Sequence, residues 1–363
     1  MDPEELIARA HVVALPMRER FRGITVREAV LIEGIGRWSE WSPFVEYADV
    51  EASTWLRATL AELQAPALAA QHIAKQENRG RQADSPHADP SIPVSAGQTA
   101  VSGGIRVNAT VPAIAAPDVP ALLARFPGVR TAKVKVAERG QSLPDDLERV
   151  AAVRDALGPT GRIRVDANGL WTVDEAETAL RALARYDLEY AEQPVASVPE
   201  LAELRARIHP LVPIAADESI RKAEDPLAVV RAGAADVVVL KLQPLGGATT
   251  ALGIAEAVRA EAPDVRFVTS SALETSVGLA AAARFAGEID ARFASDLDHG
   301  LGTAALFEAD VAADPLLPVD GAVPLRDVHP DAALLDRWAA APERREWWLE
   351  RLRRCLALAA PTA

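Results

Sequence analysis

The sequence predicts an α/β protein in which a parallel sheet closes into a (β/α) barrel beside a smaller α+β domain. The chain has 363 residues, which is too long for one ordinary core. From about residue 104 to 310, short β-branched runs alternate with Ala/Leu/Arg-rich helical patterns, which is typical of a parallel sheet. Eight such runs within about 200 residues favour a closed barrel over an open sheet.

The runs expected to form the barrel strands are, in order, IRVNATV, TAKVKV, RIRVDA, LEYAEQP, VPIAADES, DVVVLKL, VRFVTSS and ARFASDL. Amphipathic stretches such as LPDDLERVAAVRDAL and VDEAETALRALARY lie between them and predict helices. A doubly wound sheet is the alternative, but no G-x-G-x-x-G motif follows the first run.

The two flanks of this region differ from it in composition. Residues 1–100 carry strand-like stretches (HVVAL, ITVREAVLIE) and one helix-like stretch, DVEASTWLRATLAELQ, and we expect them to form the capping domain. The polar, Pro/Gly/Ser-rich segment around 75–97 predicts a loop or linker. We assign 101–315 to the barrel, and 316–363 to a segment with two helices whose tryptophans (Trp338, Trp347 and Trp348) complete the packing.

Composition excludes several classes of function. The net charge of −13 argues against a nucleic-acid or acidic-membrane partner. The single cysteine, Cys355, excludes a disulfide framework and a cysteine-based zinc site. Neither a signal peptide nor an apolar run of about 20 residues is evident, so we expect a cytoplasmic protein. The sequence does not indicate an oligomeric state.

Charged and polar residues stand where the predicted strands end, and active sites of such barrels lie at that end. The strand ends, from the second to the eighth, carry Lys133 and Lys135; Asp166 and Asn168; Glu192; Asp217 and Glu218; Lys241; Ser270 and Ser271; and Asp296 and Asp298. Three consecutive strands, about 4.8 Å apart, thus bring Asp166, Glu192 and Asp217 to one rim. Such close carboxylates need a counter-charge, and oxygen ligands suit Mg²⁺, while the absence of histidine there disfavours zinc.

The second and sixth strands lie opposite each other in an eight-stranded ring. Lys135 and Lys241 would therefore face each other across the mouth, with the acids on the arc between them. A substrate carboxylate bound there would hold its α-carbon between two amines. The arrangement suits proton transfer next to the carboxylate of a small molecule.

These residues resemble the enolase superfamily, within its muconate-lactonizing-enzyme-like group. The resemblance is carried by the K-x-K pair, DANG, EQP, ADES and LKLQPLGG, which follow the family order along the barrel. It implies a (β/α)7β TIM-like barrel under an α+β capping domain. RGITVREAVLIEGIGRWSEWSPF and HGLGTAALFEADV further resemble the actinobacterial dehydratases that form o-succinylbenzoate for menaquinone synthesis.

The resemblance also implies a role for each site residue. Asp166, Glu192 and Asp217 would bind Mg²⁺, with Mn²⁺ as a substitute. Lys135 would be the base, Lys133 would lower its pKa, and Lys241 would stabilise an anionic intermediate. Asn168 and Glu218 would orient ligands or a lysine, and Ser270 and Ser271 would hold the succinyl tail of a cyclohexadiene carboxylate that undergoes syn dehydration.

Three other functions remain open from the sequence. The same two lysines could racemise or epimerise N-succinylamino acids or dipeptides, and Asp296 and Asp298 resemble the acidic pair that dipeptide epimerases use for the substrate amine. A Schiff-base aldolase-like barrel would use Lys241 as a nucleophile. A binding or scaffold protein would leave the strand-end charges without a role. In the capping domain, Arg18, Arg20 and Arg22 either reach into the site as a lid or form a solvated basic patch.

Overall fold

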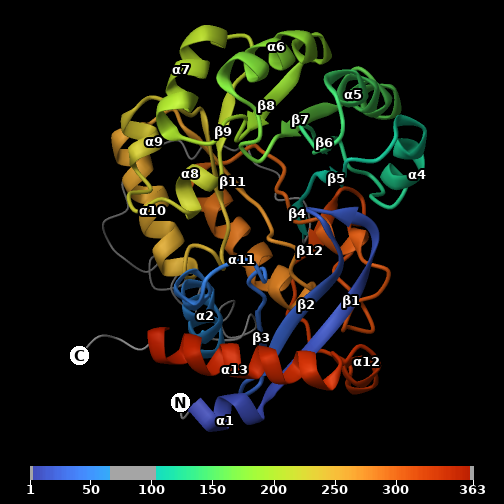
Figure 1. Ribbon diagram of the computed structural model, residues 1–363, viewed down its shortest axis with the longest axis vertical. Coiled ribbons are helices and arrows are strands. Elements are labelled where there is room, and N and C mark those ends of the chain that lie inside the picture. The colour runs from blue at the N-terminus through green and yellow to red at the C-terminus, as the bar shows by residue number, and fades with distance from the viewer. Residues whose placement is uncertain (1–2, 66–103, 360–363) are drawn as a thin grey trace, which may run out of the picture.

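The computed structural model describes residues 3–65 and 104–359, and shows a barrel seated on a smaller capping domain (Figure 1). The polar segment predicted as a loop or linker, around 75–97, lies outside the described residues. The protein is of the α/β class, as the alternation of strand and helix patterns predicted. No described helix is both long enough and apolar enough to cross a membrane.

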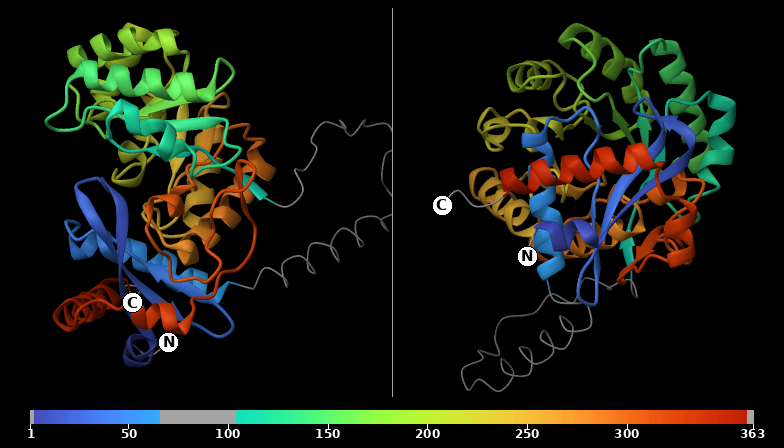
Figure 2. Two further views of the ribbon diagram at one scale, coloured as in Figure 1. Left: turned by 90° about the vertical axis from the view of Figure 1, so that its right-hand side faces the viewer. Right: turned by 60° about the horizontal axis from the view of Figure 1, so that its bottom comes forward.

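The capping domain is a three-stranded antiparallel sheet with helices against it. It contains α1 (Pro3–Ala8), β1 (Ala10–Phe21), β2 (Ile24–Glu33), β3 (Trp38–Trp41) and α2 (Asp49–Gln64), with the strands in the order β1-β2-β3. α2 has the bounds of the stretch from which a helix was predicted. α13 (Pro342–Ala359) returns from the far end of the chain and packs against α2, as two further views show (Figure 2).

Seven parallel strands form the barrel wall in the order β11-β10-β9-β8-β7-β6-β5. They are β5 (Ala109–Val111), β6 (Thr131–Lys135), β7 (Arg162–Asp166), β8 (Leu188–Glu192), β9 (Ile214–Ala216), β10 (Val237–Leu240) and β11 (Arg266–Thr269). Two isolated parallel bridges, Val107 to His299 and Ser270 to Gly300, join the outer strands through residues 299 and 300. These residues take the eighth position and close the ring.

Helices follow the strands and cover the outside of the ring. They are α4 (Val119–Leu123), α5 (Leu143–Leu157), α6 (Val173–Leu183), α7 (Val198–Ile208), α8 (Glu218–Arg221), α9 (Ala228–Arg231), α10 (Ala248–Glu261) and α11 (Ser276–Phe293), with short 3₁₀ turns η1 (Ala116–Asp118), η2 (Ala184–Tyr186) and η3 (Thr303–Leu306). A small antiparallel pair, β4 (Gly104–Arg106) with β12 (Ala322–Pro324), lies beside them, and α12 (Ala332–Arg337) precedes α13.

The eighth predicted strand is placed too early in the sequence. Arg292 and Phe293, within the run ARFASDL, form the end of α11, and the closing bridges start only at His299. The run was misleading there because the true closing segment is short and is fixed by backbone bonds to both neighbours. Asn108 N–H donates to the His299 carbonyl and Gly300 N–H to the Thr269 carbonyl.

Local sequence explains why the helices begin at the mouth of the barrel. α5, α6 and α7 each start with a capping box, in which a Ser or Thr and an acid three residues later satisfy free N–H groups reciprocally. The pairs are Ser142 with Asp145, Thr172 with Glu175 and Ser197 with Glu200. The helices therefore start directly after the loops that follow β6, β7 and β8.

Candidate active site

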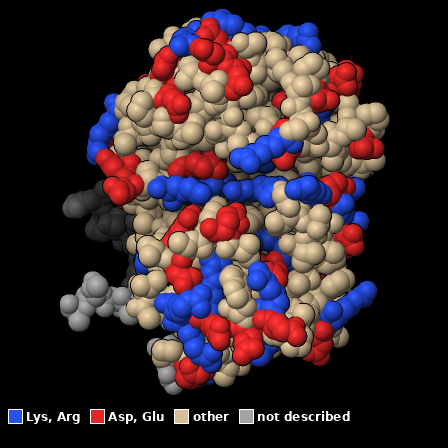
Figure 3. All heavy atoms as spheres, viewed as in Figure 1, with Lys and Arg blue, Asp and Glu red and all other residues tan. Residues whose placement is uncertain are grey.

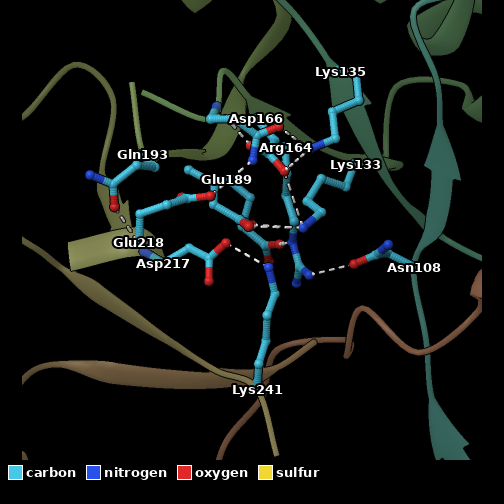
Figure 4. A network of polar contacts seen from close by, with 12 residues as sticks. Asn108, Lys133, Lys135, Arg164, Asp166, Glu189, Gln193, Asp217, Glu218 and Lys241 are labelled. Carbon is cyan, nitrogen blue, oxygen red and sulfur yellow. Dashed lines mark hydrogen bonds and ion pairs between the residues drawn. The ribbon is translucent and has the colours of Figure 1, made fainter. Parts of the chain in front are cut away.

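The register of the parallel strands sets the predicted residues side by side. Lys135 pairs with Asp166 across β6 and β7, and Asp166 pairs with Glu192 across β7 and β8. Asp217 follows β9 directly and Lys241 follows β10. Because parallel strands present their carboxyl ends on one rim, these side chains meet at the same mouth of the barrel (Figure 4).

The lysines lie inside the barrel, although a half-exposed strand with a solvated lysine face would also have matched the sequence. Lys133 is 6% exposed and Lys135 is 8% exposed. Lys133 Nζ donates to both Glu192 oxygens at 2.9 and 3.0 Å, and Lys135 Nζ donates to Asp166 Oδ2 at 2.5 Å. Lys241 Nζ approaches from the opposite side and donates to Asp217 Oδ2 at 2.5 Å (Figure 4).

The two lysines of the K-x-K pair have different environments. Burial opposes the charge on Lys133, but the carboxylates of Glu192 and Asp166 outweigh it and raise its pKa. Burial lowers the pKa of Lys135, and the neighbouring Lys133 charge lowers it further against the attraction of Asp166. Lys133 is therefore the permanent cation of the pair, and Lys135 is the one that gives up its proton more readily.

Two of the carboxylates beside these lysines, Asp166 and Asp217, are ionised, whereas burial raises the pKa of Glu192. The pKa of Asp166 falls to about 2, since Lys135 and Lys133 together outweigh the effect of its burial. The pKa of Asp217 also falls well below its usual range, because Lys241 and Arg221 outweigh its burial. Ionised, deeply buried oxygens of this kind are ligands that a hard divalent cation prefers.

Asn168 and Glu218 link the neighbouring strands. Asn168 Oδ1 accepts from Lys135 Nζ at 2.5 Å, and its backbone N–H donates to Asp166 Oδ1 at 3.1 Å. Asn168 Nδ2 donates to Glu218 Oε1 at 3.3 Å, while Glu218 Oε2 is buried without a hydrogen-bond partner in the part of the chain described. Asn168 thus contacts Lys135 directly, and an orienting role for it stays a prediction.

One pocket contains both lysine groups and reaches the capping domain. It is lined by Phe21, Arg22, Phe44, Thr110, Lys133, Lys135, Asp166, Asn168, Lys241, Ser270–Leu273, Gly300 and Thr303. Ser270 and Ser271 lie on its wall, and Ser271 Oγ shares a hydrogen bond with Thr303 Oγ1 at 2.7 Å. Lys135 Nζ lies 5.3 Å from the Phe21 ring centroid, so the capping domain touches the reactive end of the site.

Asp296 and Asp298 lie away from this pocket. Asp298 Oδ2 accepts from Thr131 Oγ1 at 2.7 Å, and Thr131 is the first residue of the strand whose last residue is Lys135. The backbone carbonyl of Asp296 accepts from Arg162, the first residue of β7. The acidic pair is therefore at the amino ends of the strands and holds the base of the barrel together.

Three buried residues at or below the site were not identified from the sequence. Arg221 Nε donates to Asp217 Oδ1 at 3.0 Å, and Gln193 Oε1 accepts from the backbone N–H of Asp217 at 3.1 Å. Arg164, fully buried, donates to Glu189 and Asn108 beneath the lysines (Figure 4). Gln193 and Arg164 had a signal in the sequence, since each lies within two residues of a predicted metal ligand; Arg221 had none.

The three acids face lysines in this structure. Within residues 3–65 and 104–359, no group of three acidic, histidine or cysteine side chains is arranged to hold a metal ion. Asp166, Glu192 and Asp217 each accept a hydrogen bond from a lysine ammonium instead. The donor chemistry suits a hard cation, and accommodating one requires these carboxylates to turn from the ammonium groups.

Comparison with known proteins identifies the family. The enolase C-terminal domain-like family matches residues 121–330, and the enolase N-terminal domain-like family matches residues 12–62. The o-succinylbenzoate synthase of Mycobacterium marinum is 51% identical over 98% of this chain and 95% of its own, and that of Mycobacterium leprae is 49% identical over 99% and 95%. The chain belongs to the o-succinylbenzoate synthase family of the enolase superfamily. It is accordingly an enzyme, a lyase of the dehydratase type.

Solved structures of the enolase superfamily share its fold. The muconate lactonizing enzyme of Pseudomonas fluorescens, complexed with muconolactone, has a TM-score of 0.69 at 20% identity and covers 92% of this chain and 98% of its own. An N-succinyl Arg/Lys racemase of Bacillus cereus has a TM-score of 0.66 at 18% identity, covering 92% and 97%. These likenesses confirm the predicted barrel with its capping domain.

Proposed function

We infer that the chain catalyses the syn dehydration of 2-succinyl-6-hydroxy-2,4-cyclohexadiene-1-carboxylate to o-succinylbenzoate, a step of menaquinone synthesis. The observation that carries this proposal is the pair Lys135 and Lys241, on opposite sides of one pocket with the acids between them, in a chain about half identical to o-succinylbenzoate synthases. The elimination makes the ring aromatic, so it runs strongly downhill.

The site needs a divalent cation to complete it, and Mg²⁺ fits best. Asp166, Glu192 and Asp217 would hold it, because they are ionised or buried oxygen donors on three adjacent strands and no histidine competes. A bound divalent cation supplies a Lewis acid that stabilises negative charge on a substrate carboxylate. Mn²⁺ would serve as a substitute, since it prefers the same oxygen ligands.

The side chains of the chain itself carry out the proton transfers. Lys135, with its pKa lowered by burial and by Lys133, removes the proton next to the ring carboxylate. Lys241 remains a cation opposite it and stabilises the negative charge that develops. Lys135 then returns the proton to the departing hydroxyl, and water leaves from the same face. Asn168 keeps the Lys135 amine aimed at the pocket throughout.

The substrate tail would lie between the Ser270–Leu273 loop and the capping domain. Arg22 from the capping domain lines the pocket there, 4.6 Å from the Phe44 ring, and with Gly23 it forms the two-residue turn between β1 and β2. Both turn residues have positive φ, 50° and 81°, as such hairpin turns require. Arg22 is therefore the candidate for binding the succinyl carboxylate.

The surface charge supports a small anionic substrate. Lys and Arg side chains form a band across one face, between the barrel and the capping domain, although the chain carries a net charge of −13 (Figure 3). A positive entrance on an acidic protein attracts a small dicarboxylate, whereas the overall charge repels nucleic acid and acidic membranes. We accordingly propose a cytoplasmic enzyme acting on a small molecule.

An ultraviolet assay for o-succinylbenzoate formation tests the proposal. Purified protein with Mg²⁺ should convert the cyclohexadiene substrate, EDTA should abolish turnover, and Mg²⁺ or Mn²⁺ should restore it. Absence of product under these conditions would refute the proposed reaction. Turnover that is indifferent to chelation would remove the metal from the mechanism while leaving the dehydration in place.

A further inference from the structure

The loop between β11 and α11 forms one wall of the pocket and has a strained backbone. Residues 270–273 of this loop line the pocket, and Leu273 adopts a φ of 64°. A leucine in this left-handed region costs of the order of 1–3 kcal/mol and persists only where its surroundings hold it there. The groups that hold this loop therefore determine the shape of the pocket wall.

Arg27 of the capping domain binds two carbonyls of this loop. Its Nε donates to the Leu273 carbonyl at 3.0 Å, and its Nη2 donates to the Ala272 carbonyl at 3.1 Å and also to the Ser42 carbonyl. Its guanidinium stacks 4.3 Å from the Phe44 ring, another residue of the pocket lining, and Arg27 itself is only 2% exposed. A single rigid fork from β2 thus fixes the strained residue.

Glu40 of β3 binds the other end of the same loop. Its Oε2 accepts from the backbone N–H of Thr275 at 3.0 Å, from the Thr275 hydroxyl at 2.7 Å and from the N–H of Gly278 at 3.1 Å. Glu40 is 2% exposed and therefore places a carboxylate from the capping domain on the N-terminus of the 18-residue helix α11. Glu274 stabilises the loop from within, accepting from Ala272 N–H at 2.6 Å.

The same contacts extend to the segment after β10, which carries Lys241. Ser42 Oγ donates to Glu40 Oε1 at 2.6 Å, and Ser42 N–H donates to Gln243 Oε1 at 3.3 Å. Gln243 lies two residues after Lys241. One connected set of buried polar groups in the capping domain therefore spans the ends of both β10 and β11.

We propose that Arg27 and Glu40 are positioning residues for substrate binding, which hold the Ala272–Leu273 wall of the pocket in its binding conformation from across the domain interface. The inference rests on the proposed function only for the identity of the ligand and the place of its tail. Neither side chain lines the pocket or reaches the lysines. Since the proposed function places the substrate tail against this wall, loosening it weakens the binding of substrate and transition state alike, and KM rises while kcat changes little.

Two conservative variants test this role. Arg27→Lys keeps the charge but loses the planar fork that reaches the carbonyls from two nitrogens, Nε and Nη2. Glu40→Gln keeps the shape but leaves one acceptor oxygen for four donor groups. At pH 8 we expect each to raise KM for the cyclohexadiene substrate at least tenfold with kcat within threefold of wild type. The Kd of the product, o-succinylbenzoate, measured by calorimetry, should rise by the same factor.

Glu62→Gln is the matched control. Glu62 also crosses this interface, accepting from Arg37 at 3.0 Å and pairing with Arg284 of α11, but it contacts none of residues 270–275. The Glu62→Gln variant should have a lower melting temperature and an unchanged KM. If Arg27→Lys fails to fold, Glu40→Gln decides alone.

The outcomes separate the two proposals. Wild-type protein that neither forms nor binds o-succinylbenzoate refutes the proposed function, and the role of the wall with it. An active wild type whose two positioning variants match the control in KM and in product Kd refutes the positioning role alone. A loss confined to kcat would also refute it.

Discussion

Lys133 and Lys135 stand two residues apart on one strand, yet their neighbours give them different chemistry. Lys133 Nζ donates to both carboxylate oxygens of Glu192. Both lysines lie near Asp166 Oδ2, which is 2.5 Å from Lys135 Nζ and 3.5 Å from Lys133 Nζ. Two titratable groups whose environments push their pKa values apart mark the acid–base assignment. This difference supports the proposal that Lys135 is the base, with the charge of Lys133 helping to lower its pKa.

The first prediction concerns the two opposed lysines. Lys135→Ala and Lys241→Ala should each lower kcat by roughly 10²–10⁴-fold, because one removes the base and the other removes the charge that stabilises the intermediate. Circular dichroism should show both variants folded. Lys222→Ala, which removes an exposed lysine that stacks on Tyr47, should retain full activity. A Lys135→Ala enzyme with most of its kcat would assign the base elsewhere.

The second prediction concerns the pH dependence of stability. Burial and the nearby Glu274 charge raise the pKa of Glu40 from 4.5 to about 7, against Arg27 and the bonds from Ser42 and Thr275. Between pH 4.5 and 7 the folded protein thus binds more protons than the unfolded chain, and the contribution of Glu40 to stability falls as pH rises. Glu40→Gln removes this loss, which amounts to up to about 3 kcal/mol.

Urea unfolding of wild type and Glu40→Gln at pH 5 and pH 8 measures the effect. The free energy of unfolding of the variant, relative to that of wild type, should be higher at pH 8 than at pH 5. Glu274→Gln serves as the comparison. Removing this repelling carboxylate lowers the pKa of Glu40, so the unfolding free energy of the variant should change less with pH than that of wild type. If the free energy of unfolding depends on pH identically in wild type and Glu40→Gln, Glu40 has the same pKa in the folded protein and in the unfolded chain.

At the scale of elements, the sequence predicted the charged residues at the strand ends but not the contacts that the loops make with the capping domain. The acids and lysines could be placed because parallel strands bring their carboxyl ends to one rim, so position along a strand fixes position in space. The contacts of Arg27 and Glu40 with the loop after β11 could not be predicted, because that loop lies more than 230 residues away in the sequence and several of the bonded atoms belong to its backbone. The closing segment at 299–300 was missed for a related reason, since no side-chain pattern marks it.

The third prediction concerns the packing of α11 beneath the capping domain. A Cβ at Gly278 would lie 2.7 Å from Glu274 Cβ and 2.9 Å from Glu40 Oε2, closer than real contacts allow. Gly278→Ala should therefore destabilise the protein by about 1–3 kcal/mol, although alanine is the better helix former. Gly253→Ala in α10 meets nothing within 4 Å and should instead stabilise by up to about 1 kcal/mol.

Chemical unfolding of both glycine variants gives the comparison directly. The two changes are chemically identical and both lie inside helices, so the difference between them isolates the contact with Glu40 and Glu274. Gly278→Ala as stable as Gly253→Ala would mean that the capping domain does not press on α11 as the structure shows.

At the scale of the whole molecule, the capping domain is built from two distant parts of the chain. Its sheet and α2 come from the first 65 residues, and α13 is added after the barrel is complete (Figure 1). Trp348 of α13 is fully buried, stacks edge-on against Trp41 of β3 at 5.5 Å and donates its indole N–H to Glu28 of β2. The barrel cannot close its pocket without this domain, because Phe21, Arg22 and Phe44 line it.

The last prediction therefore joins stability to ligand binding. Trp348→Ala should cost about 3–5 kcal/mol, since it leaves a cavity in the domain core and removes the indole hydrogen bond to Glu28. Leu358→Ala, on the same helix but 48% exposed, should change stability by less than about 0.5 kcal/mol. Because the pocket is shared between barrel and capping domain, o-succinylbenzoate at a hundred times its Kd should restore about 2.7 kcal/mol of the loss. Thermal unfolding with and without the product measures this recovery, and a Trp348→Ala protein that the product does not stabilise would show that the variant no longer forms the pocket that binds the product.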